Sequence, residues 1–396
     1  MIWQPHRRPV VHAALAFTLL VPALASAQEP AAIITGRYVA PDGTLQPGAA
    51  ILLSGGKIQS IVPADSYDKE TNVVRHPNAV LCPGLIDVRS QIGASENLIE
   101  TTNAIDPGAS AIDSLDRHHR DFRAALRAGI TTVMLTPSPN NLISGAAAIV
   151  KTARASKGED DAILVKHGPL MFALGSSVWS YDRAPTSRVG SLAMLRAALD
   201  DAAGGRGHER LQAFAKGRIE GVVVCEEAMD VSAALRTFAQ RRLSVAIAHT
   251  SDVHDLGEEL VRLCHAVIVG PYTFEDSPRK LSTAAAWSSA GVPVIFTAQM
   301  PEHAADALRI TAALAVRYGM DPAKARRAIT GLPAIVTGVP KRIGSIKEGM
   351  DADLVVFSDD PLQLDARVLE VYIDGVRVYR AVGSVTMSSR DKSGGL

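Results

Sequence analysis

Several residues that could do chemistry stand directly after short apolar segments of this chain. Arg89 and Gln91 end one such segment, Glu226 follows a second and His249 follows a third. Arginine carries a permanent charge and only hydrogen-bond donors, so Arg89 could bind an anionic ligand. Histidine and glutamate bind divalent metals and transfer protons, so His249 and Glu226 are candidates for a metal site or for catalysis.

Each of these residues also has a simpler structural explanation. Arg89 could form an ion pair with Glu226 or another carboxylate, because a buried arginine is usually paired. His249 could be a hydrogen-bonded core residue, since no local spacing supports three convergent metal ligands. Cys225 and His249 could form a nucleophilic pair, but a buried and inert thiol is the favoured interpretation.

Two further candidates lie in expected loops. His167 follows an apolar segment and is a candidate metal ligand, although a loop histidine without a metal is favoured. Asn141 stands near Gly145 in a loop after an expected strand, where barrel proteins place residues that contact ligands. We therefore count Asn141 among the candidate ligand-binding residues.

The elements that must position these residues follow an alternating pattern. Short apolar strands alternate with helical segments, which is typical of α/β proteins and predicts a TIM (β/α)8 barrel over residues 83–340. The expected strands are 85–88, 129–135, 163–165, 170–174, 221–224, 244–248, 266–269 and 292–296. The expected helices are 114–128, 192–203, 231–240, 254–263, 302–318 and 322–329.

The two ends of the chain read as strands and turns. Residues 28–82 and 341–385 both contain strand and hairpin patterns, and we expect them to form the two halves of one small composite β-sandwich. Residues 386–396 are rich in Ser, Lys and Gly and predict a flexible tail.

The first 27 residues have the pattern of a secretory signal peptide. Arg7 and Arg8 precede an apolar run, and Ala25-Ser26-Ala27 forms an A-x-A cleavage site. The apolar run covers about a dozen residues, against the roughly 20 that a membrane span needs, so no stable membrane anchor is expected. The segment predicts an exported protein, periplasmic or secreted.

Composition narrows the classes of partner. The 396 residues contain 41 Lys and Arg and 41 Asp and Glu, so no charge excess indicates nucleic acid as a partner. The three cysteines, Cys82, Cys225 and Cys264, have no C-x-x-C spacing and indicate neither a zinc ribbon nor a redox motif.

Several motifs carry a resemblance to a known family. Residues 80–93, VLCPGLIDVRSQIG, resemble the start of the first barrel strand in the amidohydrolase superfamily, where Pro-Gly-Leu-Ile-Asp precedes His-x-His. Residues 129–133 are similar to the family's G-x-T-T-V strand. Residues 137–146, PSPNNLISGA, resemble a Gly-rich loop of the imidazolonepropionase-like branch. Residues 342–361, RIGSIKEGMDADLVVFSDDP, resemble the family's C-terminal signature.

This resemblance implies a metal site at the carboxyl ends of the strands. The family places His-x-His on strand one, histidines on strands five and six, and Asp on strand eight. Arg89 and Gln91 stand at the first positions, Glu226 stands at or near the strand-five position, and Gln299 stands where the Asp is expected. Only His249 matches a family histidine, so the resemblance implies that most metal ligands and the proton shuttle are lost.

Two hypotheses follow. In the favoured one, the chain is a degenerate homologue without a cofactor, which binds a small molecule through Arg89, Gln91, Asn141 and Gln299 at the barrel mouth. Such a protein could also pair with an active homologous subunit or form a homo-oligomer. In the alternative, it hydrolyses amide or other C–N bonds with one divalent metal, such as zinc, in a rebuilt site. The candidate residues for that site are His249, Glu226 and His167.

Overall fold

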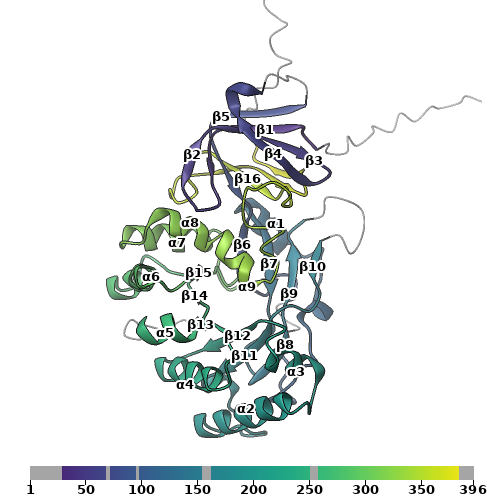
Figure 1. Ribbon diagram of the computed structural model, residues 1–396, viewed down its shortest axis with the longest axis vertical. Helices are drawn as coiled ribbons and strands as arrows, with labels where there is room; N and C mark the ends of the chain where they lie inside the picture. The colour runs from purple at the N-terminus through teal and green to yellow at the C-terminus, as the bar shows by residue number, and fades with distance from the viewer. Residues whose placement is uncertain (1–28, 68–71, 95–97, 154–161, 250–256, 383–396) are drawn as a thin grey trace, which may run out of the picture.

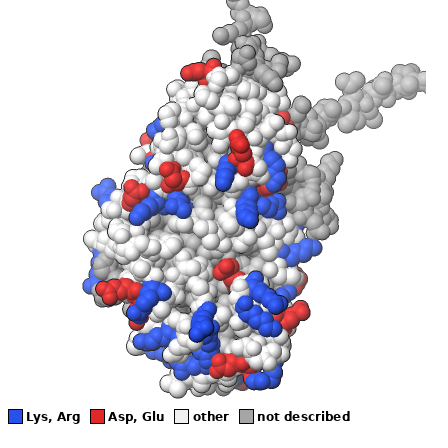
Figure 2. Space-filling model, viewed as in Figure 1, with Lys and Arg blue, Asp and Glu red and all other residues white. Residues whose placement is uncertain are grey.

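The computed structural model describes residues 29–67, 72–94, 98–153, 162–249 and 257–382, with the backbone alone for His249. The expected signal segment and the expected tail lie outside these residues. Within them, no helix combines the length and the apolar character needed to cross a membrane. On the face shown in Figure 2, basic side chains lie interspersed with acidic ones.

Strands from both ends of the chain form one sheet, which lies at one end of the molecule (Figure 1). We call it the composite sheet; its order is β18-β17-β16-β5-β1-β3-β4, and β2 pairs with β1. Strand β16 pairs antiparallel with β5 and thereby joins the two termini. The expected sandwich is therefore a single eight-stranded sheet in its hydrogen bonding. The bounds are β1 Ala32–Val39, β2 Leu45–Pro47, β3 Ala49–Ser54, β4 Lys57–Pro63, β5 Val73–Pro83, β16 Leu354–Phe357, β17 Val368–Ile373 and β18 Val376–Arg380.

The two faces of the composite sheet contact different cores. Successive residues of a strand point to opposite faces because the backbone is pleated. Leu81 and Val356 belong to an apolar cluster formed by the terminal segments. Cys82 and Val355 point the other way and join the large core that extends into the central part of the chain.

The central strands form two sheets around a shared apolar interior. One has the order β10-β9-β7-β6 and the other the order β15-β14-β13-β12-β11-β8. Only Ala147 separates β8 from β9, so one stretch of chain belongs to both sheets. Strands of both sheets contribute to one buried cluster, which includes Val88, Met134, Met171 and Ile295. The bounds are β6 Leu85–Ser90, β7 Ile130–Leu135, β8 Ile143–Ala146, β9 Ala148–Lys151, β10 Ile163–Val165, β11 Leu170–Leu174, β12 Gly221–Cys225, β13 Ala246–His249, β14 Ala266–Val269 and β15 Val294–Phe296.

The first central strand, β6, is connected to the segment after the last one, β15, by hydrogen bonds to the side chain of Asp87. Among the described residues no strand pairing joins β6 to β15. Asp87, fully buried on β6, accepts hydrogen bonds from Thr297 Oγ1 at 2.5 Å and from Ala298 N at 3.1 Å. Burial raises the pKa of the Asp87 carboxyl, and these hydrogen bonds act against that shift. The mixed α/β fold is confirmed, but the described hydrogen bonds do not close a barrel.

The third strand of the series differs from the prediction. Segment 163–165 is strand β10, which lies at the edge of the four-stranded sheet. Its expected position is taken by β8 and β9, which run antiparallel to β11 and β7. The expected loop 137–146 therefore contains a strand. Its Gly and Ala residues, which have low β-propensity, concealed it in the sequence. Gly145 has φ of 101°, and a Cβ there would lie 2.4 Å from the carbonyl oxygen of Ala109, so the strand requires glycine.

Helices α4 to α8 line one side of the six-stranded sheet (Figure 1). The expected helix 302–318 begins at Ala307, so Glu302 lies in the loop after β15. The expected helix 114–128 is confined to α1, and α3, α6 and α9 were not predicted. The bounds are α1 Asp121–Arg127, α2 Arg188–Ala203, α3 Glu209–Ala215, α4 Ala228–Ala239, α5 Gly257–Leu263, α6 Pro278–Ala290, α7 Ala307–Arg317, α8 Pro322–Ala328 and α9 Gly331–Val336.

A buried lysine connects the central strands to the C-terminal segment. Lys151 ends β9, and its side chain is fully buried. Its Nζ donates hydrogen bonds to Asp351 at 2.8 Å, Asp353 at 3.0 Å and Asp374 at 2.6 Å. Arg342 also pairs with Asp351. We call Lys151 and the three aspartates the lysine cluster. Through these ion pairs, Asp351 and Asp353 of the C-terminal signature connect the segment next to the composite sheet with β9.

The lysine cluster predicts a specific pH dependence of stability. Burial raises the pKa of Asp353 from 3.8 to about 6, although Lys151 opposes the shift. The folded state therefore holds this proton more tightly than the unfolded chain, and the resulting stabilisation is lost as the pH rises from about 4 to about 6. We expect Asp353→Asn to remove this contribution, which is on the order of 1–3 kcal/mol. Urea unfolding measured between pH 4 and pH 7 checks this.

The exposed Asp365 provides the control for that experiment. Asp365→Asn changes the net charge equally and should leave the slope of stability against pH as in the parent protein. Parallel pH profiles for Asp353→Asn and Asp365→Asn would show that Asp353 does not titrate in this window.

Candidate functional site

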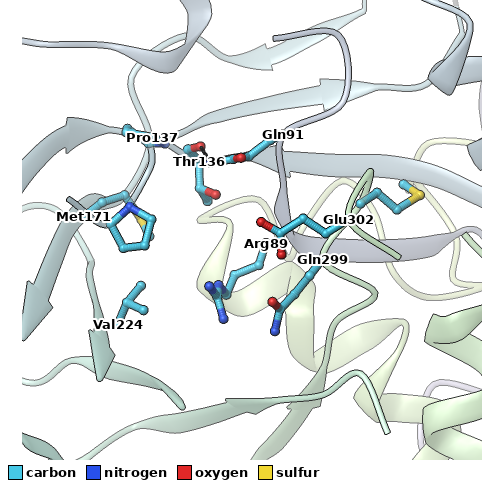
Figure 3. A pocket seen from close by; sticks show the side chains of 10 residues that line it. Arg89, Gln91, Thr136, Pro137, Met171, Val224, Gln299 and Glu302 are labelled. Atoms are coloured by element: carbon cyan, nitrogen blue, oxygen red, sulfur yellow. Dashed lines mark hydrogen bonds between the residues drawn. The ribbon is translucent and has the colours of Figure 1, made fainter. Parts of the chain in front are cut away.

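A small pocket lies at the carboxyl ends of the central strands (Figure 3). It encloses about 80 Å³. Its polar groups come from the end of β6 and from the segments that directly follow β6, β7 and β15, and part of its apolar wall comes from β11 and β12. The lining residues are Arg89, Gln91, Thr136, Pro137, Pro139, Met171, Val224, Gln299, Met300 and Glu302.

A local irregularity of β6 accompanies the change of direction at its end. The register of β6 against β7 shifts between Asp87 and Ser90, where three steps on β6 oppose two on β7. Such a bulge changes the direction of the side chains that follow it. Val88 and Arg89 both lie within this shifted stretch: Val88 faces the buried interior, whereas Arg89, like the following Gln91, lines the pocket.

Arg89 extends its guanidinium into the pocket (Figure 3). Among the described residues, no hydrogen-bond acceptor or ion-pair partner lies within bonding distance of this guanidinium. Burial lowers the pKa of Arg89 from its usual value, and the charges of Glu302 and Asp87 act against that shift. Arginine nevertheless stays charged, because its pKa begins far above neutrality. Within the described part of the chain, the pocket therefore presents a cation whose donors have no protein partner.

Two glutamines flank this cation with fixed side-chain amides. Gln91 Nε2 donates to Ser138 Oγ at 3.0 Å, and Gln91 N donates to the carbonyl of Met300 at 2.7 Å. Gln299 Nε2 donates to the carbonyl oxygen of Gly270 at the end of β14. Gln299 also has φ of 54°, an uncommon conformation for a residue other than glycine. Both predicted residues thus line the pocket and are held in place by neighbouring strand ends.

Glu226 supports a loop beside the site and does not pair with Arg89. Its carboxylate accepts hydrogen bonds from Ser176 N and Ser176 Oγ at 2.8 and 2.7 Å, and from Ser177 N at 2.8 Å. Burial raises the pKa of Glu226, but these hydrogen bonds outweigh burial and hold the pKa below its usual value. The hypothesis of an Arg89–Glu226 ion pair is therefore wrong, and Glu226 fixes the start of the loop after β11.

Gly175 makes this arrangement possible and carries a testable prediction. It has φ of 142° and ψ of −173°, and a Cβ there would lie 2.5 Å from Glu226 Cδ. We expect Gly175→Ala to lower the free energy of unfolding by about 1–3 kcal/mol, because only glycine adopts this backbone conformation readily. Thermal or urea unfolding measures the effect.

Gly190 in α2 is the matched control for that substitution. A Cβ there would meet its nearest neighbour at 3.5 Å, so Gly190→Ala should be neutral or stabilising by about 0.5–1 kcal/mol. Equal stability of the two variants would mean that the loop tolerates a side chain at Gly175.

Of the other predicted site residues, Asn141 and His167 do not line the pocket. Asn141 is buried and uses both ends of its amide on other loops, donating to the carbonyl of Glu100 and accepting from Arg183, each at 2.6 Å. His167 precedes β11, so it does not follow a strand that leads into the pocket, and it hydrogen bonds to Ser110 Oγ at 2.9 Å. These two predictions are corrected accordingly.

His249 and Cys225 pair in the ladder between β13 and β12. The side chain of His249 lies outside the described residues, so its predicted role stays a prediction. Cys225 is buried, and burial raises the pKa of its thiol well above the usual value. A thiol that stays protonated is a poor nucleophile, which supports the interpretation of Cys225 as an inert core residue.

The strand-end residues whose side chains are described do not fit a divalent metal. In the part of the chain that the structure describes, no three His, Cys, Asp or Glu side chains come together in a way that could hold one. Arg89 places a fixed positive charge in the pocket, and Glu226 is engaged by Ser176 and Ser177. A guanidinium repels a metal cation and offers it no lone pair.

Several pocket residues were missed by the sequence analysis. Glu302 was assigned to a helix, but it lies in the loop before α7 and lines the pocket. Met171 and Val224 form part of the apolar wall, and in the sequence they resemble ordinary core residues. Pro301 before Glu302 did not argue against a helix there, because proline is common in the first turn of a helix, so the sequence carried no clear signal for this loop.

Comparisons with known proteins agree with the motifs. Residues 276–379 match the profile described as the amidohydrolase family. Amidohydrolase tasK of Hapsidospora irregularis is 23% identical over 378 residues, a match that covers 81% of this chain. The chain spans only 38% of the length of that relative.

Solved structures show the same fold. An amidohydrolase from Thermotoga maritima MSB8 has a TM-score of 0.78 at 25% identity, over 88% of this chain and 100% of that one. Phenylurea hydrolase B has a TM-score of 0.55 at 13% identity, over 88% of this chain and 97% of that one, and supports the fold alone. The motifs, the profile over residues 276–379 and the structural likeness all indicate the amidohydrolase superfamily.

Proposed function

We propose that this chain is an exported, degenerate member of the superfamily, which binds a small anionic molecule at the strand-end pocket and does not carry out metal-dependent hydrolysis. The single observation that carries the proposal is the guanidinium of Arg89, which enters the pocket without a protein acceptor among the described residues. A carboxylate or similar anion would satisfy this guanidinium through charge-assisted hydrogen bonds. Export rests on the signal pattern of residues 1–27.

The arrangement of strands supports a pocket at this location. In this proposal the two central sheets are the wall of a distorted TIM barrel, with β8 and β9 together as the third strand and Asp87 at the open seam. TIM barrels bind ligands at the carboxyl ends of their strands, where Arg89, Gln91 and Gln299 lie.

Metal analysis tests the loss of the family's chemistry. The purified mature protein is dialysed against trace zinc and manganese, and its metal content is measured by inductively coupled plasma mass spectrometry. We expect a metal content far below one ion per chain, because Arg89 occupies the pocket. One tightly held ion per chain would overturn the proposal and support the rebuilt metal site with His249.

Binding is tested separately by isothermal titration calorimetry with a panel of small carboxylates. Saturable binding that is lost in an Arg89 variant is the expected result. A panel without any binder, with a folded protein, would show that the pocket does not bind small carboxylates.

A further inference from the structure

The pocket contains a second charged group of opposite sign. Glu302 stands in the loop between β15 and α7, is exposed to solvent and lines the same pocket as Arg89. Figure 3 shows both side chains directed into the pocket from different segments. Glu302 attracts Arg89 electrostatically, yet the two groups do not form an ion pair among the described residues. The two opposite charges therefore lie in the same pocket without forming an ion pair with each other.

This arrangement is unfavourable for a ligand with a single charge. A carboxylate that binds Arg89 also meets the negative field of Glu302, and an amine that binds Glu302 meets the positive field of Arg89. Because both charged groups line the same small pocket, the second charge acts on a bound ligand together with the first. A ligand with both charges meets no such conflict.

We propose that the ligand is a small zwitterion of the α-amino acid type, whose carboxylate pairs with Arg89 and whose ammonium pairs with Glu302. The assignment rests on the proposed function, because it names the class of molecule that the pocket binds. The volume of about 80 Å³ suits a carboxylate, an α-carbon and an ammonium group.

The remaining wall of the pocket fits the same molecule. Gln91 and Gln299 hold their amides beside the charged groups, where polar atoms can accept or donate hydrogen bonds. Met171, Val224 and Met300 provide an apolar surface for the α-carbon and its substituent. Small-molecule sites commonly combine such a wall with a few fixed polar groups.

The test compares an amino acid with molecules of nearly equal shape that lack one charge. L-Alanine is compared by isothermal titration calorimetry with isobutyrate, which has a methyl group in place of the ammonium, and with isopropylamine, which lacks the carboxylate. The other proteinogenic amino acids are screened in parallel against the carboxylic acids that lack their amino group. We expect the best amino acid to bind at least about 10-fold more tightly than its carboxylic acid, as charge-assisted pairs contribute about 1.5–3 kcal/mol.

Glu302→Gln should abolish this preference by weakening the amino acid and not the carboxylic acid. Glu275→Gln, an exposed carboxylate in the loop after β14 that does not line the pocket, should retain it. Equal affinity of amino acid and carboxylic acid in the parent protein would overturn the zwitterion and leave the anion-binding function intact. Absence of binding by both classes would overturn the two proposals together.

Discussion

Replacing Lys151 by Met is expected to lower the free energy of unfolding by about 3–5 kcal/mol, which is a large part of the stability of a typical domain. The ammonium of Lys151 is the shared donor of Asp351, Asp353 and Asp374, and its side chain is fully buried. Removing it leaves three neighbouring carboxylates with one positive partner fewer, in a site where water cannot replace it. Urea unfolding near neutral pH provides the measurement.

Lys216→Met is the control, because Lys216 is exposed and the substitution changes the net charge equally. Asp353→Asn in the Lys151→Met background should recover part of the loss, since it removes one of the uncompensated charges. A loss of less than about 1 kcal/mol in Lys151→Met would mean that the cluster behaves like a surface ion pair.

Replacing Arg89 by Met is expected to weaken binding of a small carboxylate by about 10- to 100-fold while leaving the unliganded fold as stable as before or more stable. The affinity falls because a charged hydrogen-bonding partner contributes about 1.5–3 kcal/mol. Stability should not fall, because the guanidinium has no acceptor among the described residues to lose and is desolvated in the pocket. Groups kept for function commonly oppose stability in this way.

Two measurements on the same variant separate these effects. Calorimetric titration gives the affinity, and thermal unfolding without ligand gives the stability. Arg89→Lys keeps the charge but loses the planar fork, so it should bind with intermediate affinity. Arg206→Met, at an exposed ion pair beyond α2, should change neither quantity. A marked fall in unliganded stability for Arg89→Met would make Arg89 a structural residue.

The sequence correctly predicted those pocket residues whose position depends only on where a strand ends. Arg89, Gln91 and Gln299 each follow a strong apolar segment, and the carboxyl ends of neighbouring parallel strands converge. Glu302 could not be found in this way, because the helical pattern of α7 was extended over the loop before it. Its distance from Arg89 depends on how that loop folds, which local sequence does not specify.

Errors in the site followed from an error in strand order. When 163–165 is taken as the third strand, His167 comes at the carboxyl end of a barrel strand and becomes a metal candidate. The structure gives the third position to β8 and β9, and His167 then precedes β11 instead. Asn141 failed for another reason: a loop position does not reveal which groups its amide contacts, and here they are Glu100 and Arg183.

The pairing of β5 with β16 has a consequence for how the nascent chain matures. Strand β5 ends at Pro83 and leaves the ribosome long before its antiparallel partner, which begins only at Leu354. Until then, one edge of β5 exposes unpaired backbone groups of the kind that associate with other chains. Contacts between such distant segments also form slowly. The composite sheet therefore cannot close between β5 and β16 until the chain has been made as far as β16, and a chaperone that holds this edge would act on a strand whose partner is distant in the sequence.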